Sequence, residues 1–534
     1  MDMFIKILLL IIFFAVTVGV GFYFRKRSAD IAGFVLGGRE VGPWITAFSY
    51  GASYFSAVIF VGFAGQFGWR FGISATWIGL ANALLGSALA WIVLGRRTRI
   101  MTTHLGSATM PAFFGSRFDS QKLKIGASLI VFIFLIPYTA SLYNGLSRLF
   151  EMAFGLDFVL CIVIISVLTG VYVVAGGYFA QAVNDFIQGI IMLFGIIAVI
   201  VVVLGNNGGF MGAITSLASP ALADETISNG TVSGIFSSFF GPDPFSLFGV
   251  MILTSLGTWG LPQLVSRFYS IKSENMIKKG TVISTLFATV VAGGCYFLGG
   301  FGRLYSDVIE YRPNGSPIFD SIIPKMLEGL PVILIGIVLV LVFAASMSTL
   351  SSLVIASSST LTLDCLKGHI VKKMSEKTQL IIIRLLIIVF IIISAAIATF
   401  QYSSGGSVIW IAQLMGISWG ALAGAFLAPF LYGLFWKRAT KAAVWVNFVF
   451  STVFMVANVV FNIFFNDIYL TYFPKVFTSP TGLINAGAFV MLAGLIIVPL
   501  VSYITKAPDK KMVEHCFAGY EQPVTTKLST SLGE

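Results

Sequence analysis

The sequence predicts an all-α protein that crosses a membrane about thirteen times. Of its 534 residues, 57% are hydrophobic and 10% are charged, whereas a soluble protein carries about 25% charged residues. The apolar residues fall in runs of about 17 to 25, the length that a helix needs to cross the hydrocarbon core. These two observations exclude an ordinary soluble protein and indicate a polytopic membrane protein.

The first apolar run, residues 4–24, is interpreted as a membrane span and not as a cleavable signal peptide. It is about 20 residues long and is followed by Arg25, Lys26 and Arg27 instead of the small residues of a cleavage site. We therefore expect an additional transmembrane helix within residues 1–30.

Twelve further spans are predicted along the chain, which places the termini on opposite sides of the membrane. With the N-terminus outside, 25 of the 33 Lys and Arg residues fall in cytoplasmic segments, seven fall outside and Arg384 lies within a span. Because positive residues concentrate in cytoplasmic loops, we expect the C-terminus in the cytoplasm of a plasma-membrane protein. The predicted spans are 4–24, 43–66, 71–95, 125–150, 158–178, 184–205, 245–266, 281–302, 331–361, 380–400, 406–435, 441–465 and 483–505.

Two polar segments lie outside the spans. Residues 206–244 contain no Lys or Arg and are expected to form an extracellular loop, and residues 506–534 are expected to form a cytoplasmic tail. Neither is long enough for a soluble domain with its own activity. The function must therefore lie in the membrane bundle.

Two of the predicted spans are interrupted. Span 43–66 has a Gly-Ala-Ser sequence at 51–53, and span 245–266 has two glycines and a proline within 257–262. Glycine and proline weaken helical hydrogen bonding, and the freed carbonyls are tolerated at membrane depth only inside protein or beside a wet cavity. Each interruption alone is compatible with a packing kink, but interruptions at corresponding positions of two halves indicate a transporter binding site. Counting from them predicts five-helix units at 31–205 and 245–438 and extra helices at 439–505.

A stripe of small and hydroxyl residues marks the ninth predicted span. At 3.6 residues per turn, one face collects Ala345, Ser348, Thr349, Ser352, Ala356 and Ser359. Hydroxyl groups gain nothing from facing lipid, so this face is expected to meet protein or an ion. Two interpretations remain open: close helix packing, or oxygen ligands from Ser348 and Thr349 for a small hard cation.

Six segments of the chain carry recognisable motifs. They are GFVLGGREVGPWITAFSYGASYFSAVIFVG (33–62), YTASLYNGLSRLFEMAFG (138–155), VYVVAGGYFAQAVNDFIQG (171–189), GLPQLVSRF (260–268), MSTLSS (347–352) and GLFWKRATKAA (433–443). In their order and spacing these segments resemble the sodium/solute symporter family, and within it the sodium/proline symporter branch. The resemblance implies the LeuT-type fold, in which two five-helix repeats are inverted relative to each other. This fold agrees with the interruptions described above.

The resemblance also implies a sodium ion between the break in the second span and the ninth span. Carried onto this sequence, its ligands are the main-chain carbonyls of Ala52, Phe55 and Ala345 and the hydroxyls of Ser348 and Thr349. Neutral oxygens suit a hard monovalent ion, which does not need the carboxylate cage of Ca²⁺. Na⁺ is then a coupling ion transported with the solute, and no cofactor is expected.

Asp185 matches a family aspartate that assists sodium on its inner path. It lies near the start of the sixth span, shortly after Gly176 and Gly177. An ionisable residue near the membrane is a functional candidate. The alternative is a charge that compensates the dipole at a helix N-terminus.

The solute is expected at mid-membrane between the second and seventh spans. Ser56 and Tyr138 match positions that resemble substrate-linked residues of the proline branch, whereas Tyr54 and Val58 stand where that branch has an aspartate and a tryptophan. Ordinary helix packing is the alternative for each aromatic. The candidate wall residues are Tyr54, Ser56, Tyr138, Thr258, Trp259, Pro262 and Gln413, with Tyr143 and Trp419 beside them.

The predicted pocket disfavours a sugar. The polar pair of the sugar branch is replaced by Val58 and Ile59, and its gating tyrosine by Thr258. Each buried sugar hydroxyl left unpaired costs about 1–3 kcal/mol. A proline-like amino acid or an organic carboxylate is favoured, since a half-helix N-terminus can receive a carboxylate.

The function expected from these features is sodium-coupled symport by alternating access. The alternatives are a membrane-embedded solute sensor and a symporter that uses another coupling ion. An enzyme is disfavoured, because no Ser-His, paired-Asp or HExxH arrangement lies at membrane depth and the four cysteines are scattered. The expected partners are a small solute, sodium and the lipid bilayer. The net charge of +11 is attributed to membrane topology, so no nucleic-acid partner is expected. The sequence makes no prediction of the oligomeric state.

Overall fold

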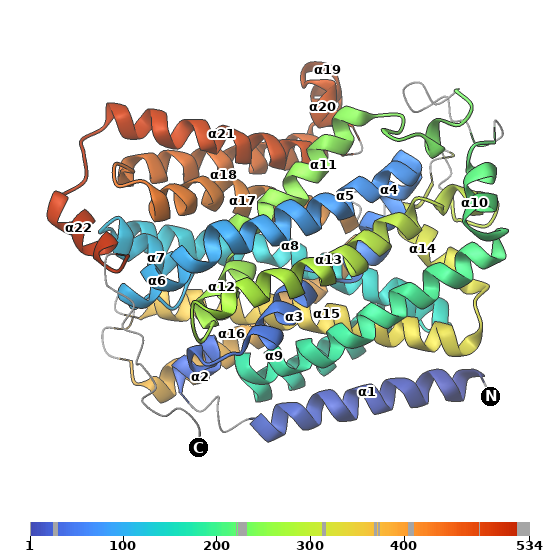
Figure 1. Ribbon diagram of the computed structural model, residues 1–534, viewed down its shortest axis with the longest axis horizontal. Helices are drawn as coiled ribbons and strands as arrows, with labels where there is room; N and C mark the ends of the chain where they lie inside the picture. The colour runs from blue at the N-terminus through green and yellow to red at the C-terminus, as the bar shows by residue number, and fades with distance from the viewer. Residues whose placement is uncertain are drawn as a thin grey trace, which may run out of the picture.

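A computed structural model describes residues 2–24, 30–219, 222, 232–311, 315, 317–367, 371, 374–403, 411–479 and 481–520. The described residues are almost entirely helical, with three isolated β-bridges as their only extended pairing. Most helices run along the long axis of the molecule (Figure 1). α1 (Asp2–Phe24) begins at one end of this axis, and α22 (Lys510–Ala518) lies at the other end (Figure 1).

Between these two helices the chain forms twenty further α-helices within the described residues. They are α2 (Ile31–Leu36), α3 (Pro43–Tyr54), α4 (Ala64–Phe71), α5 (Thr76–Ala81), α6 (Arg96–His104), α7 (Met110–Arg117), α8 (Gln121–Phe154), α9 (Phe158–Asn206), α10 (Gly209–Leu217), α11 (Pro244–Leu256), α12 (Pro262–Ser270), α13 (Met276–Gly299), α14 (Phe319–Glu328), α15 (Val332–Thr360), α16 (Glu376–Ser403), α17 (Ile411–Phe435), α18 (Lys441–Phe464), α19 (Asn466–Tyr472), α20 (Lys475–Thr478) and α21 (Gly482–Ile504). Short 3-10 or π-helical turns lie at Gly37–Arg39, Val58–Phe63, Gly72–Ala75, Asn82–Leu89, Trp91–Gly95, Ile235–Ser237, Gly257–Gly260, Gly302–Tyr305 and Leu361–Leu366.

The predicted number of thirteen spans is approximate. Among the described residues, ten helices are long and apolar enough to cross a membrane, or eleven when the bent pair α11 and α12 counts as one span. The predicted second and third spans are joined through Gly72, whose φ is +63°. The predicted fifth and sixth spans both lie in α9, which is broken at Gly177 with a φ of +60°. Glycine adopts this left-handed backbone conformation without the steric cost of a side chain.

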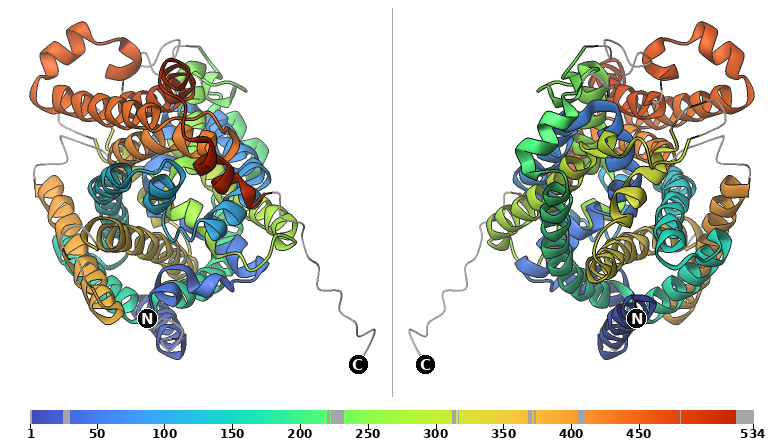
Figure 2. Two further views of the ribbon diagram at one scale, coloured as in Figure 1. Left: turned by 90° about the vertical axis from the view of Figure 1, so that its left-hand side faces the viewer. Right: turned by 90° about the vertical axis from the view of Figure 1, so that its right-hand side faces the viewer.

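α15 and α17 are the most deeply buried membrane helices. In their most apolar windows 83% and 94% of the residues are buried, compared with 17% in α1, which lies at the periphery of the bundle (Figure 2). α15 packs against α8, α9 and α16, and α17 packs against α8, α18 and α21. The hydroxyl stripe of α15 therefore faces protein on all sides and not lipid.

α13 approaches α4 and α5 backbone to backbone. A Cβ atom added at Gly68 of α4 would lie 1.9 Å from the carbonyl oxygen of Gly299, and one added at Gly79 of α5 would lie 2.5 Å from the Cα atom of Gly293. Both distances are shorter than any ordinary contact between heavy atoms. Glycine at these positions therefore fixes α4 and α5 directly against α13.

Candidate functional site

The second predicted span is broken at Phe55. α3 ends at Tyr54, and Phe55 adopts an extended backbone with φ −89° and ψ 135°. The chain becomes helical again in the π-helical turn Val58–Phe63 and continues into α4. The break falls just after the Gly-Ala-Ser sequence at 51–53, which itself remains helical.

The seventh predicted span is broken at Leu261. α11 passes into the 3-10 turn Gly257–Gly260, Leu261 is extended with φ −90° and ψ 116°, and α12 begins at Pro262. The two parts are bent by 47° relative to each other. Proline suits the first turn of α12, where its missing N–H is not needed.

The break at Phe55 meets the hydroxyl stripe of α15 through Thr349. The Oγ1 atom of Thr349 lies 3.3 Å from the carbonyl oxygen of Ser53, 3.2 Å from that of Phe55 and 3.1 Å from that of Ala345. Ser348 is fully buried, and its Oγ atom makes no well-formed hydrogen bond among the described residues, although it lies beside the Asp185 carboxylate. A hydroxyl has one proton and can donate to only one of three carbonyls. The arrangement is therefore rich in oxygen acceptors, as a cation site requires.

Of the five predicted sodium ligands, the structure brings three into contact: the Thr349 hydroxyl with the carbonyls of Phe55 and Ala345. Ser348 neighbours Thr349 on α15, and Ala52 makes no such contact within the described part of the chain. The contact from α3 to Thr349 is made by the carbonyl of Ser53, the residue after Ala52. Ala52 is fully buried beside it.

Asp185 lies in a buried polar network and not at a solvated helix terminus. It is fully buried in α9 and accepts a short hydrogen bond from the hydroxyl of Ser49 in α3. Arg267 of α12 places Nη2 3.4 Å from Asp185 Oδ2 and donates to the hydroxyls of Ser53 and Ser352, both at 2.6 Å. This network joins α3, α9, α12 and α15.

Arg267 is the residue that the sequence interpretation missed. The charge count placed it in a cytoplasmic segment, but only 1% of its side chain is exposed. The signal was available, because Arg267 directly follows the predicted span 245–266, and an arginine at membrane depth needs a partner. Its partner Asp185 could not be read from local sequence, since the two residues lie on different helices.

Three aromatic candidate residues, Tyr54, Tyr138 and Trp419, form a group beside the break, and Ser56 lies next to it. The ring of Trp419 in α17 lies 5.9 Å from that of Tyr54 and 6.0 Å from that of Tyr138. Tyr54 donates its hydroxyl to the carbonyl of Thr254. Ser56 and Trp419 lie beside the Tyr138 hydroxyl. Ser56 Oγ, Tyr138 Oη and Trp419 Nε1 are buried without a well-formed hydrogen bond among the described residues.

The remaining candidates lie elsewhere. Thr258 and Trp259 hydrogen-bond to the carbonyls of Gly86 and Leu85 in the π-helical turn Asn82–Leu89. Tyr143 is buried on α8, five residues after Tyr138. Gln413 is half-buried near the start of α17, about 9 Å along the helix axis from Trp419.

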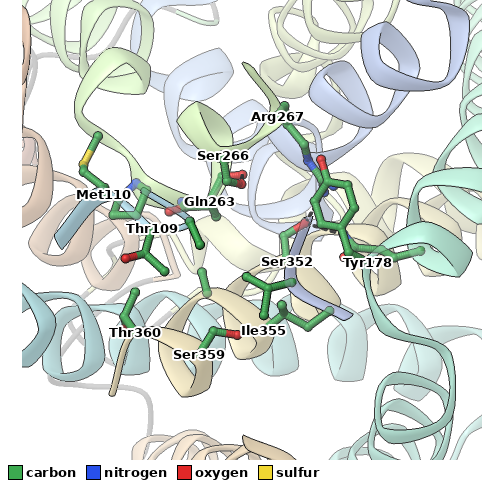
Figure 3. A pocket seen from close by; sticks show the side chains of 15 residues that line it. Thr109, Met110, Tyr178, Gln263, Ser266, Arg267, Ser352, Ile355, Ser359 and Thr360 are labelled. Carbon is green, nitrogen blue, oxygen red and sulfur yellow. Dashed lines mark hydrogen bonds between the residues drawn. The ribbon is translucent and has the colours of Figure 1, made fainter. Parts of the chain in front are cut away.

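Pro262 lines a small cavity next to the Arg267 network. The cavity has a volume of about 30 Å³ and lies between α9, α12 and α15. Gln263, Arg267 and Ser352 face it (Figure 3). We call it the inner cavity.

These features define a class of protein. A polytopic helix bundle, with two spans broken within their length and oxygen atoms gathered at one break, is the architecture of a secondary transporter built on a LeuT-type inverted repeat.

The sequence comparisons identify the family. The family model described as "Sodium:solute symporter family" matches residues 34–448. The chain belongs to this family. It is 28% identical over 519 residues to a sodium/proline symporter of Staphylococcus aureus (strain JH9), covering 94% of this chain and 93% of the relative.

Solved structures support the fold. A Na⁺-coupled sialic acid symporter in a substrate-bound outward-open state aligns with a TM-score of 0.73 and 20% identity, covering 95% of this chain and 98% of that one. A nucleobase-cation-symport-1 family transporter aligns with a TM-score of 0.50 and 14% identity, covering 90% and 97%.

Proposed function

We propose that the protein is a sodium-coupled symporter that imports a small organic solute by alternating access. The observation that carries this proposal is the position of the Thr349 hydroxyl among the carbonyl oxygens of Ser53, Phe55 and Ala345. Family membership and the likeness to a sodium/proline symporter support it. In this proposal Na⁺ is cargo and no cofactor takes part.

The site explains how ion and solute are coupled. An ion held by α3 and α15 favours the conformation that also forms the solute pocket, because Tyr54 and Ser56 flank Phe55. By thermodynamic linkage the solute must raise the sodium affinity by the same factor. The membrane potential contributes about 2.3 kcal/mol per charge per 100 mV to this inward movement.

We propose a proline-like amino acid or an organic carboxylate as the solute, in preference to a sugar. The group around Trp419 is aromatic and offers few polar atoms, whereas a sugar needs a partner for each buried hydroxyl. We further propose that the N-terminus lies outside the cell. The start of α1 and the position of α22 at opposite ends of the bundle (Figure 1) support an odd number of crossings.

Purified protein in liposomes tests the function. We expect an inward sodium gradient to drive uptake of the solute that most raises the unfolding temperature in a screen of amino acids, carboxylates and sugars, each with and without sodium. Equal accumulation in potassium-only medium contradicts sodium coupling. Solute-specific stabilisation without any flux supports a sensor instead.

Replacing Tyr138 with phenylalanine is expected to weaken solute affinity about fivefold to tenfold and to leave the sodium dependence unchanged. The reason is the loss of one hydrogen bond, worth about 1 kcal/mol, with the ring contact to Trp419 retained. The measurement is half-saturation of uptake for solute and for sodium. Tyr143→Phe is the matched control. Equal losses in both affinities from Tyr138→Phe would indicate structural damage and refute a specific solute contact.

A further inference from the structure

Two cavities lie in series at the end of the bundle that carries α7 and α12. The inner cavity, at about 30 Å³, can hold water but is small beside the second cavity. The second cavity has a volume of about 500 Å³ and is lined by Gln121, Lys124, Asp364 and Lys367, among others. We call it the vestibule. A solute that fits the vestibule cannot fit the inner cavity in this conformation.

Ala108 and Thr109 line both cavities. They lie between α6 and α7, and Thr109 caps the N-terminus of α7 by accepting a hydrogen bond from Ala112 N at 3.1 Å. This short segment therefore forms a shared wall between the inner cavity and the vestibule.

A buried hydrogen-bonded ion pair holds this wall in place. The Thr109 hydroxyl donates to Asp364 Oδ2 at 2.5 Å, and Lys124 Nζ of α8 lies 3.2 Å from Asp364 Oδ1. Only 2% of Asp364 is exposed. Hydrogen bonds to a buried carboxylate are among the stronger ones in proteins, so Thr109 is firmly tied to Asp364.

The same ion pair connects to the sodium-binding helix. Asp364 lies in the π-helical turn Leu361–Leu366, which continues α15 directly. α15 carries Ser348 and Thr349, and its Ser352 lines the inner cavity. A π-helical turn within an α-helix is often found at a functional position. A path from the sodium site towards this end of the bundle thus passes the inner cavity, the Thr109 wall and the vestibule in that order.

We propose that Thr109, Asp364 and Lys124 form the inner gate of the transport path. While the Thr109–Asp364 hydrogen bond is made, the wall separates the inner cavity from the vestibule. When it breaks, the segment at Ala108 and Thr109 moves away and the two cavities join. The need for such a gate rests on the proposed transport function.

The gate is tested by the accessibility of Ser359, a 1% exposed residue that lines the inner cavity. Ser359→Cys is placed in a protein whose four native cysteines are replaced by serine. A membrane-impermeant methanethiosulfonate reagent is applied to the cytoplasmic face of inside-out vesicles. Thr109→Val is expected to speed labelling about tenfold or more, because it removes a hydrogen bond to a charged group. Thr109→Ser, which keeps the hydroxyl, is expected to label at the parent rate. An unchanged rate in Thr109→Val, or equal acceleration by Thr109→Ser, overturns the gate.

A double-mutant cycle separates the gate from the helix cap. Asp364→Leu alone is expected to speed labelling, and adding Thr109→Val is expected to change the rate little further, because both remove the same hydrogen bond. If the acceleration of labelling in the double variant equals the product of the accelerations in the two single variants, Thr109 acts only as the N-cap of α7, and the proposal is overturned.

This assay needs neither sodium nor a known solute. Faster labelling in Thr109→Val with no sodium-driven uptake by the parent protein keeps the gate and rejects the proposed function. Sodium-driven uptake with unchanged labelling keeps the function and rejects the gate.

Discussion

Replacing both Ser348 and Thr349 with alanine is expected to raise the sodium concentration for half-maximal uptake at least about 100-fold. Thr349 Oγ1 lies among three carbonyl oxygens, and Ser348 is fully buried beside it on α15. A hydrogen bond or ligand contact to a charged group is worth about 1.5–3 kcal/mol, so the loss of two oxygens costs about 3 kcal/mol or more. The measurement is uptake into liposomes at fixed solute and varied sodium.

Thr349→Ser is the matched control for this pair, since it keeps the oxygen and removes only a methyl group. It is expected to change the half-saturating sodium concentration only slightly. Sodium dependence that is the same in the double alanine variant as in the parent protein would mean that the ion does not bind here. The expression level and the elution volume of the variants show whether the fold is intact.

Replacing Arg267 with methionine is expected to abolish uptake and to reduce the stability of the purified protein by about 3–5 kcal/mol. Methionine retains much of the side-chain volume but leaves Asp185 buried without its cation, and breaking a buried ion pair in this way is costly. The hydroxyls of Ser53 and Ser352 also lose their donor. Thermal unfolding in detergent measures the loss.

Two further variants identify the cause of the losses expected in Arg267→Met. Adding Asp185→Asn to Arg267→Met is expected to recover much of the thermal stability, because no uncompensated charge remains, but not the sodium-dependent uptake. Arg148→Met removes a partly exposed arginine that pairs with Glu151 at 3.2 Å and is expected to change stability by less than about 1 kcal/mol. If Arg267→Met lowers the thermal stability and the uptake no more than Arg148→Met does, the buried network contributes to neither.

The broken spans could be predicted from the sequence because glycine and proline are helix-breaking residues that are visible locally. The interruption at 257–262 coincides with the bend between α11 and α12. The first break was displaced, since Gly51 stays helical and the extended residue is Phe55. Any residue can adopt an extended backbone, so composition gives the approximate location of a break and tertiary packing decides the residue.

The ligand carbonyls and the partner of Asp185 were harder to predict for different reasons. A main-chain carbonyl carries no signal in the residue type, so the contact of Ser53 with Thr349 could not be distinguished from one by Ala52. Arg267 was assigned to a solvated segment because counting charges near span ends ignores tertiary pairing. Gly72 and Gly177 likewise join or divide helices in ways that apolar run lengths do not show.

The glycine contacts between α13 and its neighbours limit which parts of the molecule can move. Where main chain touches main chain, as at Gly68 and Gly299, no side-chain rotamer is available to absorb a sliding displacement. In the proposed transport cycle, α4, α5 and α13 are therefore expected to move together as one rigid unit. Bending between this unit and α3 is expected at the extended residue Phe55, and bending between α11 and α12 is expected at Leu261.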